Sequence, residues 1–395
     1  WSMSPKTLLL LSNGYGEDSF ASILLEKLVQ FTKVYKIPST FLVIPLIGKG
    51  AQFYQCQSQY PDQVSIITPP FSLPNGGVYL GSAWQKSKRF IEDCFRGVIP
   101  NSGFILRELK KIKNKIDAVI GIGDFIPPLL NQLFLQKELY MVACAHTWLL
   151  KRSNQPLERL GRLTRHLFRY GCRQVYTRDR LTEQWFLQLG ITAKYLGFLG
   201  PDIKKKEENR RKIVFLPGSR KDWKNNLQFF FVAFKEVNHQ YLKDYEIHIV
   251  FSPGVDTQEI QFLLASLLKN HHFFISWSQG DYFQHLSQSA LVVGFAGTAI
   301  EQAAFLGIPS IEPWQENAIQ VNRDFIENRQ KLLLREALIP GGDTPSQLAQ
   351  VLKNTLLNLQ DYQKAAENFS QKVWEGKSNG GMTIAENIMM LLINQ

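Results

Sequence analysis

Residues 291–309 read LVVGFAGTAIEQAAFLGIP, and this stretch decides the fold class. A short apolar run passes through small residues into a segment with helical spacing, which Gly307 and Pro309 bring to an end. Such a strand–turn–helix unit is the building block of a parallel sheet covered by helices. Short apolar runs alternate with longer amphipathic ones along the rest of the chain. The sequence therefore predicts an α/β protein built from doubly wound, Rossmann-like halves.

The chain has 395 residues, of which 45% are apolar, and this length suits two domains rather than one core. The first series predicts strands at 8–12, 40–45, 118–123, 140–145, 174–177 and 193–197, and helices at 19–30, 99–113 and 182–189. The second predicts strands at 213–216, 246–251, 273–276, 291–294 and 310–312, and helices at 226–239, 257–268, 299–306 and 345–358. A charged linker near 204–212 separates them. We expect one domain at 1–203 and a second at 204–375, with 376–395 packing back onto the first.

The excess of positive charge, +11 in total, belongs to the first half of the chain. Residues 1–200 contain 25 Lys and Arg against 13 Asp and Glu, a net +12, whereas 201–395 contain 20 against 21, a net −1. This asymmetry predicts an anionic partner for the first half. No known nucleic-acid motif accompanies the charge, so we expect a membrane surface and no nucleic acid.

The densest basic segment is 151–180, where arginines recur every three or four positions beside leucines with the same spacing. The arginines are Arg159, Arg162, Arg165, Arg169 and Arg173, and the leucines are Leu160, Leu163 and Leu167. A helix with a basic stripe beside an apolar one suits an anionic bilayer surface. The alternative is a helix packed by its leucines, with solvated arginines.

Several classes of protein and site are disfavoured. No apolar run approaches the ~20 residues that cross a bilayer, and no signal peptide is recognised, so we expect a cytoplasmic, peripheral membrane location. The four cysteines form no C-x-x-C pair, and the seven histidines form no His-Glu-x-x-His pattern. We therefore expect no metal and no tightly bound cofactor.

The first motif is SNGYGED at residues 12–18, where the first predicted strand ends. Strand carboxyl ends face the ligand crevice in open α/β sheets. Gly14 and Gly16 permit close backbone approach, but the pattern is not a full G-x-G-x-x-G, and Glu17 would repel a pyrophosphate. The loop better suits hydroxyl groups, which makes Asn13, Gly14 and Gly16 candidate acceptor-side residues.

Two further motifs follow strands of the second half. Gly218, Ser219 and Arg220 offer backbone N–H, hydroxyl and guanidinium donors, the groups that hold a diphosphate. Thr298 is placed to cap the following helix, and Glu301 stands three residues on, as in a capping box. One interpretation is that these two residues only cap. The functional one is that Gly297 and Thr298 contact phosphate while Glu301, beside Gln302, takes ribose hydroxyls.

LPGSR (216–220) followed by GTAIEQAAFLGIP (297–309) resembles the lipid-A-disaccharide synthase family of glycosyltransferases, and most closely a synthase-related subgroup. The resemblance continues at 16–18, 121–124, 195–202 and the glycines 380–381. It implies two Rossmann-like domains facing a central cleft, the glycosyltransferase-B fold. It also implies a metal-independent, inverting hexosyltransferase that uses a nucleotide sugar, for example a UDP-N-acylglucosamine, and a lipid or lipid-linked acceptor in lipid biosynthesis. Separately, 313–322 resembles the donor-sugar loop of the peptidoglycan N-acetylglucosaminyltransferase, which would bring Gln320 near the sugar; its alternative is a polar helix-surface residue.

The acceptor half departs from the family pattern. The family's Ser-Pro-Ser-Val-Trp-Ala-Trp segment is here CAHTW at 144–148, and its Pro-Asp-Phe-Asn is here DFIPP at 124–128. Donor chemistry therefore carries over better than acceptor identity. Asp124 is the candidate catalytic base, with Glu17 and His146 as alternatives, although Asp124 could simply cap a helix. Two rival functions are a sugar-nucleotide epimerase and a non-catalytic nucleotide-sugar sensor.

Overall fold

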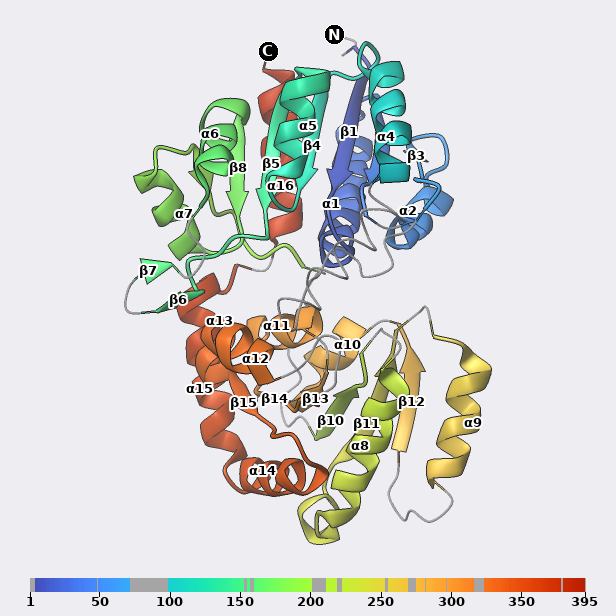
Figure 1. The fold of residues 1–395 in the computed structure, drawn as a ribbon, viewed down its shortest axis with the longest axis vertical. Coiled ribbons are helices and arrows are strands. Elements are labelled where there is room, and N and C mark those ends of the chain that lie inside the picture. The colour runs from blue at the N-terminus through green and yellow to red at the C-terminus, as the bar shows by residue number, and fades with distance from the viewer. Residues whose placement is uncertain are drawn as a thin grey trace. The chain divides into compact units, whose positions relative to one another are not determined.

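The computed structural model describes residues 4–47, 49–71, 99–152, 155–156, 160–200, 211–218, 222–252, 255–268, 275–280, 282–295, 297–315, 323–377 and 379–394. The chain divides into two compact units (Figure 1). Unit 1 comprises Trp1–Pro201 together with Lys377–Gln395, and unit 2 comprises Asp202–Gly376. The last segment of the chain therefore belongs to the same unit as the first.

Unit 1 contains a seven-stranded parallel sheet in the order β3-β2-β1-β4-β5-β8-β9. The strands are β1 (Lys6–Ser12), β2 (Ser39–Pro45), β3 (Val64–Ile66), β4 (Ala118–Ile122), β5 (Glu138–Ala143), β8 (Gln174–Thr177) and β9 (Ala193–Lys194). The helices are α1 (Tyr15–Val34), α2 (Tyr54–Gln59), α4 (Ile99–Ile112), α5 (Ile126–Leu130), α6 (Arg162–Gly171), α7 (Arg180–Gln188) and α16 (Gly380–Ile393), with helical turns η1 (Ala51–Phe53) and η3 (Asn131–Leu135). A separate antiparallel pair joins β6 (Lys151–Arg152) to β7 (Gln155–Pro156).

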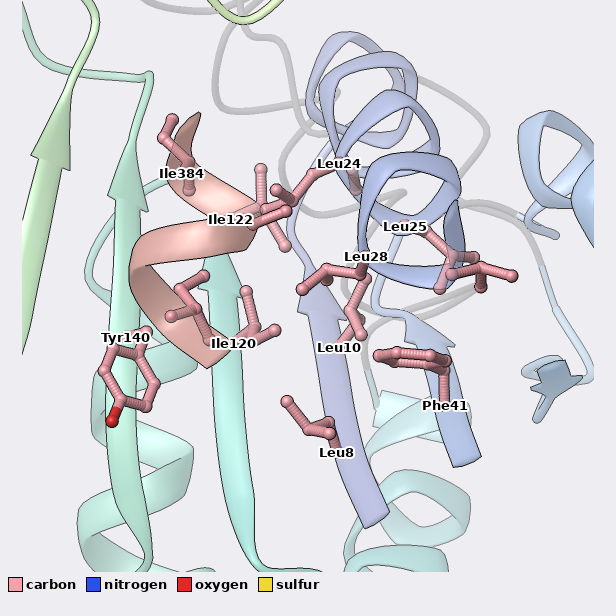
Figure 2. Close-up of a cluster of buried hydrophobic side chains, with 14 of the residues drawn as sticks. Leu8, Leu10, Leu24, Leu25, Leu28, Phe41, Ile120, Ile122, Tyr140 and Ile384 are labelled. Atoms are coloured by element: carbon pink, nitrogen blue, oxygen red, sulfur yellow. The ribbon is translucent and has the colours of Figure 1, made fainter. Parts of the chain in front are cut away.

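The core of unit 1 lies on both faces of its sheet. Leu8 and Leu10 of β1 pack with Leu24 of α1 and Ile384 of α16 in one cluster (Figure 2). The alternate residues of β1 pack on the opposite face, where Leu9 lies in a cluster with α4 residues. In a strand that is buried on both faces, every side chain packs against apolar neighbours, so no position favours a polar residue. This explains why β1 reads as a continuous run of leucines rather than an alternating pattern.

The start of α16 is fixed against the segment that follows β9. Phe198 N donates to Lys377 O at 2.8 Å, and Thr383 Oγ1 donates to Leu196 O at 2.7 Å. A Cβ added at Gly380 would overlap the backbone carbonyls of Gly197 and Phe198. Only glycine at position 380 permits this close approach of the two backbones. The start of α16 is therefore packed specifically against unit 1.

Unit 2 contains a six-stranded parallel sheet in the order β12-β11-β10-β13-β14-β15. The strands are β10 (Lys212–Leu216), β11 (Glu246–Phe251), β12 (Ile275–Gln279), β13 (Ser289–Gly294), β14 (Ser310–Glu312) and β15 (Leu338–Pro340). The helices are α8 (Trp223–Glu236), α9 (Thr257–Leu268), α10 (Tyr282–Ser287), α11 (Gly297–Phe305), α12 (Arg323–Phe325), α13 (Lys331–Leu334), α14 (Pro345–Leu357) and α15 (Leu359–Trp374). Helical turns are η4 (His239–Tyr241), η5 (Ile326–Gln330) and η6 (Arg335–Ala337). Phe215 of β10 stacks on Phe230 of α8, with ring centroids 3.9 Å apart, at the centre of the core.

The fold class predicted from the sequence is confirmed, while several local predictions are wrong. α1 begins at Tyr15, so Gly16 and Glu17 lie in its first turn rather than in a loop. The last strand of unit 1 ends at Lys194, and β12 extends to Gln279 rather than ending at Ser276.

The basic segment 151–180 also differs from its prediction. Its first part forms β6 and β7, and α6 covers only Arg162–Gly171. Leu163, assigned to the apolar stripe, is 53% exposed on α6, whereas Leu167 is buried as expected. Arg159 lies outside the described residues. Within the described part of the chain, no helix has the length and apolarity needed to cross a membrane.

Candidate functional site

Two of the motifs singled out from the sequence meet at the carboxyl edge of the unit 2 sheet. β10 and β13 are neighbours, with Leu216 opposite Gly294. Phe295 N donates to Leu216 O at 2.9 Å. Gly218 has φ +92°, and a Cβ there would lie 3.0 Å from Phe295 O. The positive φ and this close approach both require glycine, so the Gly218 turn and the turn that leads into α11 form one surface.

α11 begins at this surface. The helix starts at Gly297, so Thr298 is its second residue. An N-cap residue precedes the first helical residue, and Thr298 does not. The capping-box prediction for Thr298 and Glu301 is therefore wrong. The first turn of a helix carries free N–H groups and a partial positive charge, which attract anions. Glu301 is 8% exposed, and Gln302 is fully buried beside Tyr282.

Asn226 of α8 joins the Gly218 turn to the segment after β14. Its Nδ2 donates to Pro217 O at 2.9 Å, and its Oδ1 accepts from Gln315 Nε2 at 2.9 Å. The side chain is 6% exposed. Sequence reasoning missed Asn226, because an asparagine within a predicted helix carries no signal for two contacts this distant in the chain.

Three of the predicted donor-binding residues, Ser219, Arg220 and Gln320, lie outside the described residues, as does the side chain of Thr298. Their roles stay predictions. Gly218, Gly297, Glu301 and Gln302 are the members of that set which the structure describes.

A buried acid, Glu312, ends β14 next to the start of α11. Its side chain is fully buried, and Gln330 Nε2 donates to its Oε2 at 3.2 Å. Gln330 Nε2 in turn lies 3.7 Å from the position of a Cβ at Gly297. Burial raises the pKa of Glu312 to about 8, against the opposing effect of the hydrogen bond from Gln330. The carboxyl group is thus mostly neutral at pH 7.

The predicted acceptor-side residues gather at the carboxyl ends of β1 and β4 in unit 1. Asn13 Nδ2 donates to Asp124 Oδ1 at 2.7 Å, and the same oxygen accepts from Ile126 N at 2.9 Å. Asp124 therefore binds the start of α5, as its alternative interpretation proposed. The Glu17 carboxylate lies against Gly14, and its Cγ lies 3.4 Å from a Cβ position at Gly123.

A second carboxyl group of this cluster, Asp18, was not assigned a role from the sequence. It is 3% exposed and accepts a hydrogen bond from the Ser12 hydroxyl. Burial raises the pKa of Asp18 to about 7; the Ser12 bond lowers it, and the neighbouring Glu17 charge raises it. The sequence shows two adjacent acidic residues at 17–18, but only the burial seen in the structure shows that Asp18 is the one whose pKa is raised.

The segment after β5 carries the remaining predicted residue, His146. Its ring meets the edge of Phe168 of α6, with centroids 5.9 Å apart. Two residues earlier, the Cys144 carbonyl accepts from Arg178 Nη1 at 3.1 Å. Burial raises the pKa of the Cys144 thiol, and the Glu17 charge raises it further. His146 is therefore carried by a segment that adjoins the carboxyl cluster.

Asp179 holds the segment after β5 in place through hydrogen bonds to two threonines. Its Oδ2 accepts from Thr147 Oγ1 at 2.9 Å and from Thr182 Oγ1 at 2.7 Å, while its Oδ1 accepts from Thr182 N at 2.7 Å. The last bond caps α7. Asp179 is fully buried, and desolvation raises its pKa despite these bonds.

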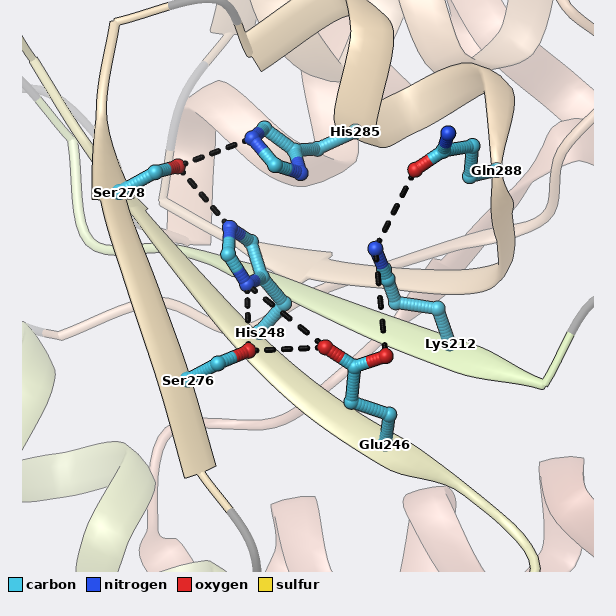
Figure 3. Close-up of polar contacts among 7 residues, drawn as sticks. All are labelled: Lys212, Glu246, His248, Ser276, Ser278, His285 and Gln288. Atoms are coloured by element: carbon cyan, nitrogen blue, oxygen red, sulfur yellow. Dashed lines mark hydrogen bonds and ion pairs between the residues drawn. The ribbon is translucent and has the colours of Figure 1, made fainter.

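Unit 2 contains a further polar cluster on β10, β11, β12 and α10 (Figure 3). His248 Nδ1 and Ser276 Oγ are 2.6 Å apart, and Ser276 Oγ donates to Glu246 Oε1 at 2.8 Å. Ser278 Oγ lies 2.9 Å from His248 Nε2 and 3.0 Å from His285 Nε2. The two imidazole rings stack with centroids 4.0 Å apart. Glu246 and Lys212 are the first residues of their strands, so the cluster extends toward the amino edge, away from Gly218.

The hydrogen bonds of this cluster assign one direction. An ionised Glu246 only accepts, so Ser276 donates to it and accepts from His248 Nδ1–H. His248 Nε2 is then an acceptor, which receives the Ser278 hydroxyl, and Ser278 accepts from His285 Nε2–H. Burial lowers the pKa of His248 to about 4; His285 and Lys212 lower it further, and Glu246 opposes them. His248 is therefore neutral at pH 7. Among the described residues, no three His, Cys, Asp or Glu side chains are grouped so as to hold a metal ion.

Comparison with known proteins identifies the fold. No family model matches the sequence, and no curated protein matches it. Among solved structures, a UDP-glucosyltransferase from Polygonum tinctorium matches with a TM-score of 0.61, 11% identity and full coverage of both chains. MurG from Acinetobacter baumannii gives 0.56 and 17% identity over 98% of this chain and 100% of its own. The UDP-GlcNAc 2-epimerase from Neisseria meningitidis, solved with UDP-GlcNAc, gives 0.55 and 14% identity over 99% and 100%. The chain therefore has the two-domain glycosyltransferase-B fold.

Proposed function

We propose that this protein is an inverting glycosyltransferase that moves a sugar from a UDP-sugar to a lipid or lipid-linked acceptor at the cytosolic face of a membrane. The observation that carries the proposal is the junction of the Gly218 turn with the turn entering α11. The Gly218 turn after β10 and the first turn of α11 after the neighbouring strand β13 form an anion-binding surface of backbone N–H groups. The solved structures of the same fold include proteins named for UDP-sugars and one bound to UDP-GlcNAc.

On the donor side, the diphosphate binds at Gly218 and Gly297, with Ser219, Arg220 and Thr298 adding donors. Glu301 takes the ribose hydroxyls, Gln302 supports it, and Gln320 approaches the sugar. These N–H groups and the Arg220 guanidinium stabilise the charge of the departing diphosphate. The proposal therefore needs no metal and no further cofactor.

On the acceptor side, a carboxylate of the unit 1 cluster removes the proton of the acceptor hydroxyl. The acceptor oxygen forms a bond to the anomeric carbon, the bond from that carbon to the phosphate oxygen breaks, and UDP leaves with the electron pair. A single displacement inverts the anomeric configuration. Asp124 is the first candidate base, because Asn13 orients it. Glu17 and His146 are the alternatives.

A basic surface on α6 supports a membrane-bound acceptor. Arg162, Arg165 and Arg169 are exposed on this helix, together with Leu163 and Tyr170. Cationic side chains beside exposed apolar ones bind anionic lipid headgroups and the outer acyl region. We propose that unit 1 contacts the membrane through this surface.

The transfer is tested with UDP-GlcNAc labelled in the sugar and vesicles made from total membrane lipid. Transfer moves label into the lipid phase, whereas an epimerase converts the donor in water without vesicles. Asp124→Asn should abolish transfer and keep UDP binding, while Glu301→Gln should weaken UDP binding at least tenfold, about 1.4 kcal/mol. Lipid labelling that persists in Asp124→Asn would remove Asp124 from the mechanism.

The second candidate is a sugar-nucleotide epimerase, which the Neisseria meningitidis structure of the same fold favours. It predicts a soluble product from donor alone. The third, a nucleotide-sugar sensor, predicts UDP binding that is lost in Glu301→Gln, and no turnover with or without vesicles. The labelled-donor experiment separates all three outcomes.

Membrane contact is tested by flotation with vesicles that contain 30% anionic lipid. Changing Arg162, Arg165 and Arg169 together to Glu should abolish flotation. The matched control changes three exposed lysines of unit 2, Lys235, Lys243 and Lys372, to Glu. Equal loss in both triple variants would show a general charge effect and refute the α6 surface.

A further inference from the structure

The carboxyl group of Glu312 lies at the edge of the unit 2 sheet where the phosphate surface is proposed. Val293 of β13 is opposite Ile311 of β14, so the next residues, Gly294 and Glu312, end neighbouring strands. β13 leads directly into α11 at Gly297. Glu312 thus ends the strand next to the one that precedes α11.

Gln330 connects the two positions. It donates to Glu312 Oε2 at 3.2 Å, and its Nε2 lies 3.7 Å from the Cβ position of Gly297. Gln330 is 2% exposed, which fixes the orientation of the pair. The fully buried carboxyl group of Glu312 is therefore separated from Gly297, the first residue of the nine-residue helix α11, by only the side chain of Gln330.

The other oxygen of Glu312, Oε1, has no hydrogen-bond partner among the residues that the structure describes. A neutral carboxyl group has one carbonyl oxygen and one hydroxyl. Since Oε2 accepts from Gln330, Oε2 is the carbonyl oxygen and Oε1 carries the proton. This leaves a buried O–H donor that needs an acceptor.

We propose that Glu312 donates this hydrogen bond to an oxygen of the second phosphate of the nucleoside diphosphate bound at the start of α11. A phosphate oxygen is a strong acceptor, and a neutral acid offers it a donor without the repulsion that an ionised carboxylate would exert. The inference rests on the proposed function, since it places the diphosphate at Gly297. It adds a specific role for a residue that no sequence motif indicated.

The pH dependence of UDP affinity follows. The pKa of Glu312 is raised to about 8. If only the neutral form binds, wild-type affinity for UDP falls about tenfold between pH 7 and pH 9. Glu312→Gln keeps an N–H donor and an acceptor of similar size and does not titrate. This variant should therefore bind UDP at pH 7 much as the wild type does, and lose less than about threefold by pH 9.

The test is calorimetric titration of the full chain with UDP at both pH values. The variants are Glu312→Gln, Glu312→Ala and, as a matched control, Glu327→Gln, which removes an exposed carboxylate of η5. Titration of the nucleotide itself affects every protein equally, so it cancels in the comparison. The expected result is that Glu327→Gln follows the wild type, while Glu312→Ala binds weakly at both pH values.

Equal loss of affinity at pH 9 in wild type and Glu312→Gln would overturn this inference while UDP binding, and the proposed function, stand. No binding of UDP by wild type at either pH would overturn both. A second measurement needs no variant: the ratio of UDP to UMP affinity of the wild type should fall about tenfold over the same range, because UMP lacks the second phosphate. An unchanged ratio would also overturn the inference.

Discussion

The stacked pair of His248 and His285 makes the stability of unit 2 sensitive to acid. His248 Nε2 accepts the Ser278 hydroxyl, and its Nδ1–H donates to Ser276. Adding a proton at Nε2 removes the acceptor and places a positive charge 4.0 Å from the second ring, near Lys212. We predict that His248→Asn lowers stability at pH 7 but weakens its dependence on pH.

The magnitude follows from the pKa difference between the folded and unfolded states. The pKa of His248 falls from 6.5 to about 4 on folding, a difference of about 2.5 units. The unfolded chain therefore binds more protons between these values, and the folded state loses stability as pH falls through this window. At ~1.36 kcal/mol per unit, the loss between pH 7 and pH 4 is about 3 kcal/mol.

The assay is urea unfolding of the full chain at several pH values from 7 to 4. Trp277 of β12 reports on unit 2, since it lies between Ser276 and Ser278. Carboxylates titrate equally in all variants, so the wild-type loss should exceed that of His248→Asn by about 3 kcal/mol. The matched control, His166→Asn on the exposed face of α6, should keep the wild-type dependence. Parallel curves for wild type and His248→Asn would refute the reasoning.

Three other perturbations have defined outcomes. Because the pKa of Asp18 is raised from 3.8 to about 7, unit 1 should lose about 4 kcal/mol as pH rises from 4 to 8, and Asp18→Asn should abolish this slope in urea titrations. Asp179→Ala should cost about 2–4 kcal/mol, because it removes the α7 cap and the bonds to Thr182; a lower midpoint in urea unfolding checks this. Gly380→Ala should destabilise by about 1–3 kcal/mol in thermal unfolding, because its Cβ meets backbone carbonyls, whereas Gly103→Ala, which meets no atom within 4 Å, should be neutral or slightly stabilising.

Much of the fold could be predicted because the apolar residues of each helix or strand follow the periodicity of that element. β1 and β13 are short apolar runs with glycines at or just after their carboxyl ends, and strands of this kind leave few alternatives to a parallel sheet. Helix starts were less predictable. Gly16 and Gly297 are predicted in turns, yet both lie in the first turn of a helix, because a glycine near a helix start is compatible with either conformation.

The site was predictable only where one segment carried the signal. Gly218 and Gly297 could be named from the composition of their segments, whereas the contact between these segments depends on β10 and β13 being neighbours, which only the structure shows. Asn226, Glu312 and Asp18 could not be named, because their properties come from burial and from partners distant in the chain. Leu163 is exposed because Thr164, Leu167 and Phe168 form the buried face of α6 and Leu163 lies at its margin; leucine spacing alone does not give this orientation.

The attachment of α16 to unit 1 has a consequence for biosynthesis. Ile384 and its neighbours cover apolar side chains of α1 and β1, which are synthesised before unit 2, whereas α16 is synthesised after it. Unit 2 is a continuous segment and can finish folding as soon as Gly376 has emerged. Unit 1 is completed only when Gly380 docks onto Gly197, so the apolar surface that α16 covers stays exposed until unit 2 has been synthesised. During synthesis, the half of the chain that is made first is therefore the half that is closed last.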